Sequence, residues 1–445
     1  MRLARHCVAA FCFFIMMFAF VPVLRTDQAN AQAAPTATTQ QPGTQEQAYH
    51  LPPDKLAKAI ALGRIRNILH FAGEIWGLAV LWLLLATGAA AELEARADRV
   101  SHKRWLQGLA FFGALIVILT LANLPLDMYA HSVSRSYGIS VQGWGSWFGD
   151  EAKALALSVV FGSLVMLLFQ WIVRRWPRRY WLGVWVATLP LLLLSILVEP
   201  FFEPIFYKFE PLQKNNPALV GELETVAART GTNIPPERMF LMQASAKTNG
   251  LNAYVSGIGS TKRIVVWDTT AGRVPDDVVM FIFGHESGHY VLNHAEKLLV
   301  LSAILLFFVY WGCARFAERL ARRFGERWKL DMTAPLACRA GFVVLLFAIS
   351  VAGFVVEPIV NTVSRHFEHE ADVYGQEAVH GLIPDPQKTG VAAFNALGEA
   401  WLEDPNPNPL IEFWEYNHPS VKTRANFAAH YDPWANGRRG KFFEK

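Results

Sequence analysis

The segment that decides how this chain is interpreted is Phe283-Gly284-His285-Glu286-Ser287-Gly288-His289-Tyr290. Just before it, Pro275-Asp276-Asp277 is typical of a helix start, because proline suits a first turn and acids stabilise the positive end of the helix dipole. On that helix His285 and His289 share one face, so both imidazoles can bind one metal ion. Glu286 points aside and is free to act as a base on a metal-bound water. The pattern predicts a catalytic zinc site, with a chance match on an ordinary buried helix as the alternative.

The third metal ligand is expected from a later part of the chain. His294 follows the second histidine by five residues, whereas the three-histidine zinc pattern needs six and an intervening glycine. The last apolar run continues into an acidic segment, in which Glu368 and Asp372 are one helical turn apart on the same face. Glu368 can therefore complete a His-His-Glu site while Asp372 orients a ligand from behind. The spacing leaves Glu368, His369 and Glu370 open as the ligand, and it also fits a solvated acidic face.

Composition indicates a membrane protein. The chain has 445 residues, of which 53% are hydrophobic, and a mean hydropathy of +0.22, which is too apolar for an ordinary soluble enzyme. The net charge is +4, and the basic residues gather in loops between apolar runs, so the surplus indicates membrane topology and no nucleic-acid binding. The four cysteines have neither zinc-finger spacing nor the pattern of a disulfide framework.

The apolar runs predict the path through the membrane. Six of them are long enough to cross a bilayer, at about residues 68–91, 105–127, 154–173, 180–200, 297–317 and 341–360. The loops 92–104, 174–179 and 318–340 are rich in Arg and Lys, so the positive-inside rule places them in the cytoplasm. By alternation, residues 201–296 and the chain after residue 360 lie on the opposite, external side.

The N-terminus has the pattern of a signal peptide. Arg2 and Arg5 precede an apolar run, and Ala31-Gln32-Ala33 is a typical cleavage site. Residues 1–33 are therefore expected to be a cleaved signal peptide or a first membrane anchor, and the alanine-rich site suggests a bacterial chain. Residues 34–67 are predicted to be a linker.

The rest of the chain divides into membrane and catalytic parts. We expect membrane helices at 68–200 and 297–360, a soluble α/β insertion at 201–296, and a third-ligand helix with a C-terminal catalytic segment at 361–445. The insertion is expected to hold a helix at 217–230 and strands at Arg238–Met242, Asn252–Ser256 and Arg263–Trp267, the last two forming a hairpin.

Two further expectations concern the site. Asn252-Ala253-Tyr254 is the candidate edge strand on which an extended substrate lies, although the same pattern fits an ordinary outer strand. The zinc-binding helix is expected to continue through Ala295 and Glu296 into the membrane span at 297–317. The last span, which contains Pro358, is expected to continue in the same way into the acidic segment.

Over about residues 60 to 430 the chain resembles the CAAX prenyl protease family of membrane-integral zinc metallopeptidases. The resemblance rests on four motifs, which are Asn252-Ala253-Tyr254, His285-Glu286-x-x-His289, Ser364-Arg365-x-x-Glu368-x-x-Ala371-Asp372 and His418-Pro419-x-x-x-x-Arg424. It implies a mainly α-helical polytopic membrane protein, with about seven membrane helices around a water-filled chamber and a small α/β zinc-peptidase domain. The implied roles are binding of one zinc ion for His285, His289 and Glu368, general base for Glu286, support of the site for Asp372, and binding of the transition state and substrate for His418 and Arg424.

We therefore expect a zinc endopeptidase of the bacterial inner membrane, with its site on the periplasmic or external side. Its partners would be protein or peptide substrates and membrane lipids, in quality control of membrane and exported proteins or in maturation of one defined peptide. CAAX-type processing of lipidated C-termini is an alternative. A transporter or membrane scaffold with a vestigial metal site is an alternative of another class. The sequence does not predict an oligomeric state.

Overall fold

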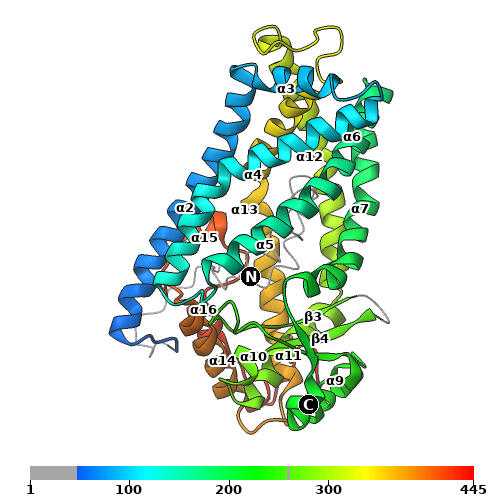
Figure 1. Cartoon of the computed structure of the whole chain (residues 1–445). Helices are drawn as coiled ribbons and strands as arrows, with labels where there is room; N and C mark the ends of the chain where they lie inside the picture. The colour runs from blue at the N-terminus through cyan, green and yellow to red at the C-terminus, as the bar shows by residue number, and fades with distance from the viewer. Residues whose placement is uncertain (1–47, 258–260, 445) are drawn as a thin grey trace.

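The computed structural model describes residues 48–257 and 261–444, and shows a long helical bundle with a smaller α/β part at one end (Figure 1). The predicted signal peptide or first anchor, and the linker up to residue 47, lie outside the described residues. The two parts have separate hydrophobic cores.

Six helices of the described residues are long and apolar enough to cross a membrane. They are α2 (Pro53–Ala86), α4 (Arg104–Ser136), α5 (Trp144–Leu157) continued through a π-helical stretch (Ser158–Gly162) into α6 (Ser163–Arg175), α7 (Tyr180–Phe202), α12 (His294–Phe324) and α13 (Arg339–Ala378). A shorter helix, α3 (Ala89–Asp98), lies between α2 and α4. Each span coincides with one of the predicted apolar runs, so the prediction of a mainly helical, polytopic membrane protein is confirmed.

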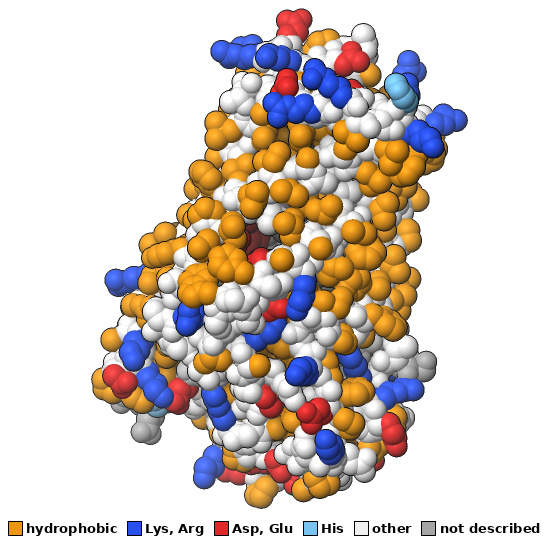
Figure 2. Space-filling model, in the orientation of Figure 1, with side chains coloured by type: hydrophobic (Ala, Val, Ile, Leu, Met, Phe, Trp, Pro, Cys, Tyr) orange, Lys and Arg blue, Asp and Glu red, His pale blue; other side chains and the backbone are white. Residues whose placement is uncertain are grey.

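The surface agrees with this division. A broad hydrophobic band covers the middle of the bundle, Lys and Arg gather above it, and charges of both signs lie below it (Figure 2). Inside the band, α4, α6, α7 and α13 pack through fully buried apolar side chains, among them Phe112, Met166, Leu192 and Phe342. The bundle therefore has the apolar exterior and interior that a lipid bilayer requires.

Helix α2 starts earlier than its apolar run. Residues 53–67 were predicted to be linker, and the structure makes them the first turns of α2. Basic residues interrupt the apolar pattern there, so hydropathy alone misses this part of the helix. Lys55 pairs with Glu399, and Arg66 donates a hydrogen bond to the carbonyl oxygen of Trp401 (3.0 Å). The start of α2 therefore packs on the α/β part.

The α/β part contains a four-stranded sheet in the order β1-β2-β4-β3. Its strands are β1 (Phe209–Pro211), β2 (Met239–Met242), β3 (Ala253–Ser256) and β4 (Arg263–Trp267). Strand β3 pairs antiparallel with β4, with Ala253 opposite Val266, so the predicted hairpin is confirmed and β3 is an edge strand.

Helices make up the rest of the described α/β part. They are α8 (Leu212–Asn215), α9 (Pro217–Thr230), α10 (Asp268–Ala271), α11 (Asp276–Val291), α14 (Pro386–Trp401), α15 (Pro409–Glu415) and α16 (Val421–His430). Short 3-10 turns occupy Glu203–Ile205, Pro236–Arg238 and Trp434–Asn436. The predicted helix at 217–230 is confirmed as α9.

The prediction that the histidine-bearing helix runs unbroken into the membrane is wrong. Helix α11 ends at Val291 and α12 begins at His294, because Asn293 between them adopts a left-handed conformation (φ 56°). Asparagine tolerates this conformation better than most residues, so it can end a helix. By contrast α13 is continuous over its 40 residues, through Pro358, as predicted, and carries Glu368 and Asp372 out of the bundle.

Candidate active site

Close packing of α11 on α13 brings the histidines next to the acidic segment. A side chain at Gly375 of α13 would meet the backbone nitrogen of His285 at 2.8 Å, and one at Gly288 of α11 would meet the Cβ atom of Tyr374 at 2.9 Å. Only glycine fits at such contacts. The two helices can therefore approach closely enough for side chains from both to meet at one point.

Two side chains of α11 and one of α13, all of types that bind metals, come together where the helices touch. The Nε2 atoms of His285 and His289 are 3.1 Å apart, and they lie 3.3 Å and 3.4 Å from the two carboxylate oxygens of Glu368. A tetrahedral ion with bonds of about 2.0–2.1 Å needs ligand atoms roughly 3.3 Å apart. The buried Glu368 Oε2 also accepts no hydrogen bond among the described residues. The three side chains therefore fit a tetrahedral metal ion.

The structure separates the three residues that spacing left open. Glu368 lies in the cluster, whereas Glu370 accepts a hydrogen bond from Lys441 (2.9 Å) and His369 packs its ring against Phe427. His369 and Glu370 therefore point away from the histidine pair, and Glu368 is the candidate ligand.

Asp372 lies behind His285, as predicted. Its Oδ1 atom is 2.9 Å from His285 Nδ1, so the ring is held with Nε2 toward the cluster. Arg424 of α16 in turn donates two hydrogen bonds to Asp372, at 2.9 and 2.7 Å, and its Nη2 lies 3.7 Å from Glu368 Oε2. The motif residues Asp372 and Arg424 are therefore one buried ion pair beside the candidate ligands.

Glu286 is half-buried next to the edge strand. Burial raises its pKa to about 7, against the lowering effects of the His285 charge and of a hydrogen bond from the Val255 backbone of β3. A carboxyl group with a pKa near neutrality is suited to take up and release a proton in a reaction. The contact with Val255 also places this group directly beside the exposed edge of the sheet.

The two histidines of α11 differ in their electrostatics. Burial lowers the pKa of His289 to about 3, so this ring is neutral at physiological pH, the form in which imidazole binds metals. Burial also disfavours the charged form of His285, but the neighbouring carboxylates of Asp372 and Glu368 outweigh it and raise the pKa to about 9.

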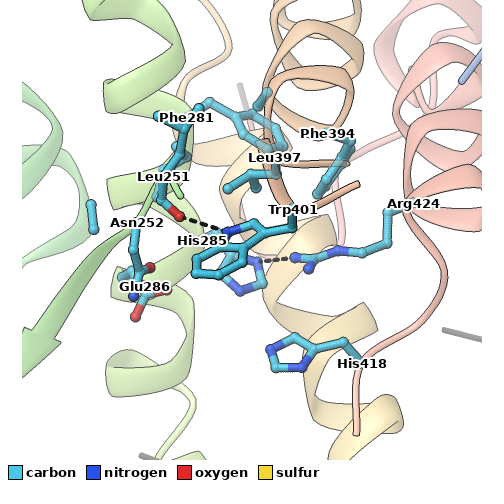
Figure 3. Close-up of a pocket in the computed structure, with 13 residues that line it drawn as sticks. Leu251, Asn252, Phe281, His285, Glu286, Phe394, Leu397, Trp401, His418 and Arg424 are labelled. Carbon is cyan, nitrogen blue, oxygen red and sulfur yellow. Dashed lines mark hydrogen bonds between the residues drawn. The ribbon is translucent and has the colours of Figure 1, made fainter. Parts of the chain in front are cut away.

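His418 closes the other side of the site. Its Nε2 atom is 3.2 Å from Glu368 Oε1, and burial lowers its pKa. Figure 3 shows Glu286 and Asn252 on one side of His285, His418 and Arg424 on the other, and Trp401 across the front.

An open hollow adjoins these groups. Its apolar lining comes from the chain before β3 and from α11 and α14, namely Leu251, Phe281, Phe394, Leu397 and Trp401. Trp401 is fixed in place by a hydrogen bond from its ring nitrogen to the carbonyl oxygen of Leu251 (3.1 Å). The lining has the apolar character of a site for a hydrophobic side chain.

The motif Asn252-Ala253-Tyr254 leads into and forms the start of the edge strand. Asn252 lines the hollow, whereas the hydroxyl of Tyr254 donates to Glu203 (2.6 Å) on the far side. Sequence reasoning missed the apolar lining from α14, because that helix shows no chemistry-bearing motif. It also gave His294 no role beyond setting it aside as a ligand, yet its ring contacts His289.

Known proteins resemble this chain over both of its parts. The peptidase family M48 profile matches residues 213–432, and the CAAX prenyl protease N-terminal profile, described as five membrane helices, matches residues 34–208. The chain is 32% identical over 388 residues to the uncharacterized metalloprotease YhfN of Bacillus subtilis, covering 87% of this chain and 88% of that one. It is 26% identical over 364 residues to CAAX prenyl protease 1 of Saccharomyces cerevisiae, covering 79% and 76%.

A solved structure has the same fold. The crystal structure of S. mikatae Ste24p superposes with a TM-score of 0.73 at 22% identity, covering 95% of this chain and 97% of that one. Membership of a peptidase family means that the chain is a metalloprotease, which acts on proteins or peptides. The alternative of a transporter or scaffold does not account for these matches. This integral membrane protein belongs to the CAAX prenyl protease family of metalloproteases, peptidase family M48.

Proposed function

We propose that the protein is a zinc endopeptidase that binds one zinc ion per chain through His285, His289 and Glu368. The observation that supports this most directly is the spacing of 3.1–3.4 Å among their ligand atoms. A set of two imidazoles and one carboxylate is typical of catalytic zinc, which keeps a further position open for water. When bound, zinc would acidify that water and polarise the carbonyl of the scissile peptide bond.

Glu286 is the proposed general base. With a pKa near 7 it can take the proton of the attacking water and return it to the leaving amine. Asp372 holds His285 in orientation, and the positive charge of Arg424 keeps Asp372 ionised.

His418 is the proposed donor to the oxygen that becomes negative in the transition state. Its Nε2 atom faces the cluster, and Nδ1 lies 2.8 Å from the side chain of Asn417. Nδ1–H donates to Oδ1 of Asn417, and in the imidazolium form Nε2–H is ready to be donated as well. A donor of this kind usually contributes about 10²–10³-fold to the rate.

The substrate is proposed to lie as an added strand on the edge of β3, beginning at Asn252-Ala253-Tyr254. An extended peptide there would pair its backbone with the strand and pass between Glu286 and His418. The hollow beside Trp401 would receive a hydrophobic side chain close to the cleaved bond.

A single substitution tests this mechanism. Glu286→Gln should bind zinc with wild-type stoichiometry by elemental analysis and cleave an unstructured reporter peptide about 10²–10⁴-fold more slowly. Glu296→Gln, the same change at an exposed position of α12, is the control and should cleave at the wild-type rate. Wild-type cleavage by Glu286→Gln would contradict the proposed role.

The arginine-rich loops suggest that the site faces outside, in the inner membrane of a bacterium. Its substrates would then be membrane or exported proteins, cleaved in quality control or maturation. The name of the yeast relative, CAAX prenyl protease 1, supports the alternative of processing lipidated C-termini. A reporter fused after Lys445 separates the two, because phosphatase activity requires an external C-terminus and fluorescence of a cytoplasmic fluorophore an internal one.

A further inference from the structure

The two histidines of the site are supported from behind in different ways. His285 Nδ1 faces the carboxylate of Asp372, which is itself paired with Arg424. His289 Nδ1 instead faces a third histidine, because it lies 3.1 Å from Nδ1 of His294. A metal-binding imidazole keeps its orientation through the hydrogen bond made by its other nitrogen. His294 occupies that position for His289.

The helix break at Asn293 creates this contact. On an unbroken helix, residues five positions apart point about 140° away from one another, so His294 could not face His289. The left-handed Asn293 turns the chain, and His294 folds back with its side chain completely buried. Its ring stacks on Phe367 of α13, with centroids 4.6 Å apart and planes inclined by 12°. Stacking on Phe367 therefore fixes both the position and the orientation of the His294 ring.

The support continues to the end of the chain. His294 Nε2 lies 3.5 Å from Glu370 Oε2, and the other oxygen of Glu370 accepts a hydrogen bond from Lys441 Nζ at 2.9 Å. Lys441 belongs to the C-terminal tail, which we define as residues 437–444. His366 is a further neighbour of Glu370, at 3.9 Å, from the exposed side. A line of contacts thus connects the tail with a candidate metal ligand.

A buried carboxylate anchors the tail. Glu377 of α13 accepts hydrogen bonds from the backbone nitrogens of Lys441 (2.6 Å), Phe442 (2.7 Å) and Phe443 (3.0 Å). The rings of Phe442 and Phe443 also pack against Tyr374. Lys441 is therefore held at a defined place on α13, although its own side chain is half exposed.

We propose that His294, backed by Glu370 and the C-terminal Lys441, is a positioning residue that presents Nε2 of His289 to the metal ion. In this arrangement His289 Nδ1–H donates to His294 Nδ1, and the single proton of His294 resides on Nε2, directed at Glu370. Each ring thus has one defined tautomer: His289 is protonated on Nδ1 and His294 on Nε2. The tail thereby contributes to metal affinity from beyond the site itself.

This inference rests on the proposed zinc site, and metal affinity tests it without any measurement of activity. The full chain in detergent is titrated with zinc against a chromophoric chelator, and the cobalt-substituted protein is followed by its visible absorption spectrum. His294→Ala should weaken zinc binding about 10- to 100-fold, the usual effect of removing such a partner, and should shift the cobalt spectrum. Lys441→Met should weaken it about two- to fivefold, as expected for a partly exposed pair.

Two variants separate positioning from a merely structural effect. His294→Asn places an amide oxygen where Nδ1 was, so it should recover most of the affinity, but it is too short to reach Glu370. Lys441→Met should therefore have no effect in the His294→Asn background, a coupling that a double-mutant cycle measures. Arg439→Met, which removes the exposed tail pair of Arg439 with Glu444, is the control and should bind zinc as the wild type does.

The outcomes are distinct. Wild-type protein that binds no zinc would overturn the proposed function itself. Wild-type protein that binds one zinc, with His294→Ala within twofold of it or with His294→Asn no tighter than His294→Ala, would overturn only the role of His294. An effect of Lys441→Met that persists in the His294→Asn background, or equals that of Arg439→Met, would overturn the connection to the tail.

Discussion

The N-terminal part of α13 buries almost only apolar side chains, whereas its C-terminal part also buries many polar and charged ones. Residues 340–349 bury apolar groups such as Phe342, Val344 and Leu346 among the other membrane helices. Residues 361–377 bury polar and charged groups, namely Asn361, Ser364, Arg365, Glu368, Asp372, Gln376 and Glu377. We call these the apolar half and the polar half of α13.

The buried polar side chains of the polar half find their hydrogen-bond and ion-pair partners in one later segment, residues 412–443, in nearly the same order along the chain. Asn361 donates to the carbonyl oxygen of Trp414, Arg365 to that of Tyr416 and Gln376 to that of Ala428. Glu368 lies beside His418, and Asp372 forms an ion pair with Arg424. Glu377 accepts hydrogen bonds from the C-terminal tail. Buried polar groups are costly without partners. Residues 412–443 therefore supply the partners that allow a membrane helix to carry a charged site beyond the bilayer.

The largest expected effect comes from breaking the charge pair of the polar half. Arg424→Met leaves Asp372 buried without its cation, which should lower the free energy of unfolding in detergent by about 3–5 kcal/mol. Lys422→Met, on the same helix but with its ammonium group bonded to Asn406 near the surface, is the matched control and should change little. Adding Asp372→Asn to Arg424→Met should recover part of the loss. Equal stability of the Arg424 and Lys422 variants would contradict this account.

The next effect concerns the rate. His418→Ala should slow cleavage about 10²–10³-fold, because the transition state loses its donor while Glu368 keeps its other neighbours. The control is His430→Ala, the same change at an exposed position at the end of α16. Since the lost contact is made in the transition state, kcat should fall with little change in KM. A rise in KM alone would show that His418 serves substrate binding instead.

Removal of the metal should act on one half of α13 only. An ion present at 100 times its dissociation constant stabilises a fold by about 2.7 kcal/mol. Chelation should therefore lower the unfolding temperature, and hydrogen exchange should become faster over residues 361–377 than over 340–349. Adding zinc back should reverse both changes. Equal loss of protection in the two halves would mean that the ion supports the whole bundle, which the separate cores argue against.

The contrast along α13 also explains what could be predicted from sequence. The apolar runs predicted all six described spans, because a helix in lipid must be apolar over most of its length. In the polar half, Asn361, Arg365, Glu368 and Asp372 recur at helical spacing, so a buried polar face was readable in principle. The histidine motif on α11 was equally readable, and its geometry with Glu368 agrees with the prediction.

The rest could not be predicted because it depends on backbone groups and on long-range contacts. Carbonyl oxygens of Trp414, Tyr416 and Ala428 serve as partners, and every residue has such an oxygen, so no pattern marks them. The break at Asn293 is a single conformational change in an otherwise helical pattern. The early start of α2 depends on its packing against α14, which hydropathy does not record.

The smallest expected effect tests where the polar half begins. Asn361, next to the apolar part of the helix, donates to the carbonyl oxygen of Trp414 at 2.6 Å. Asn361→Leu extends the apolar half by one position but leaves that carbonyl without this donor, so we expect a loss of roughly 1–3 kcal/mol in the free energy of unfolding. Leu346→Met, a swap of similar volume in the apolar half, should cost less than about 1.5 kcal/mol. If Asn361→Leu were instead stabilising, the boundary between the halves would lie further along α13, and Asn361 would belong with the residues that face the membrane core.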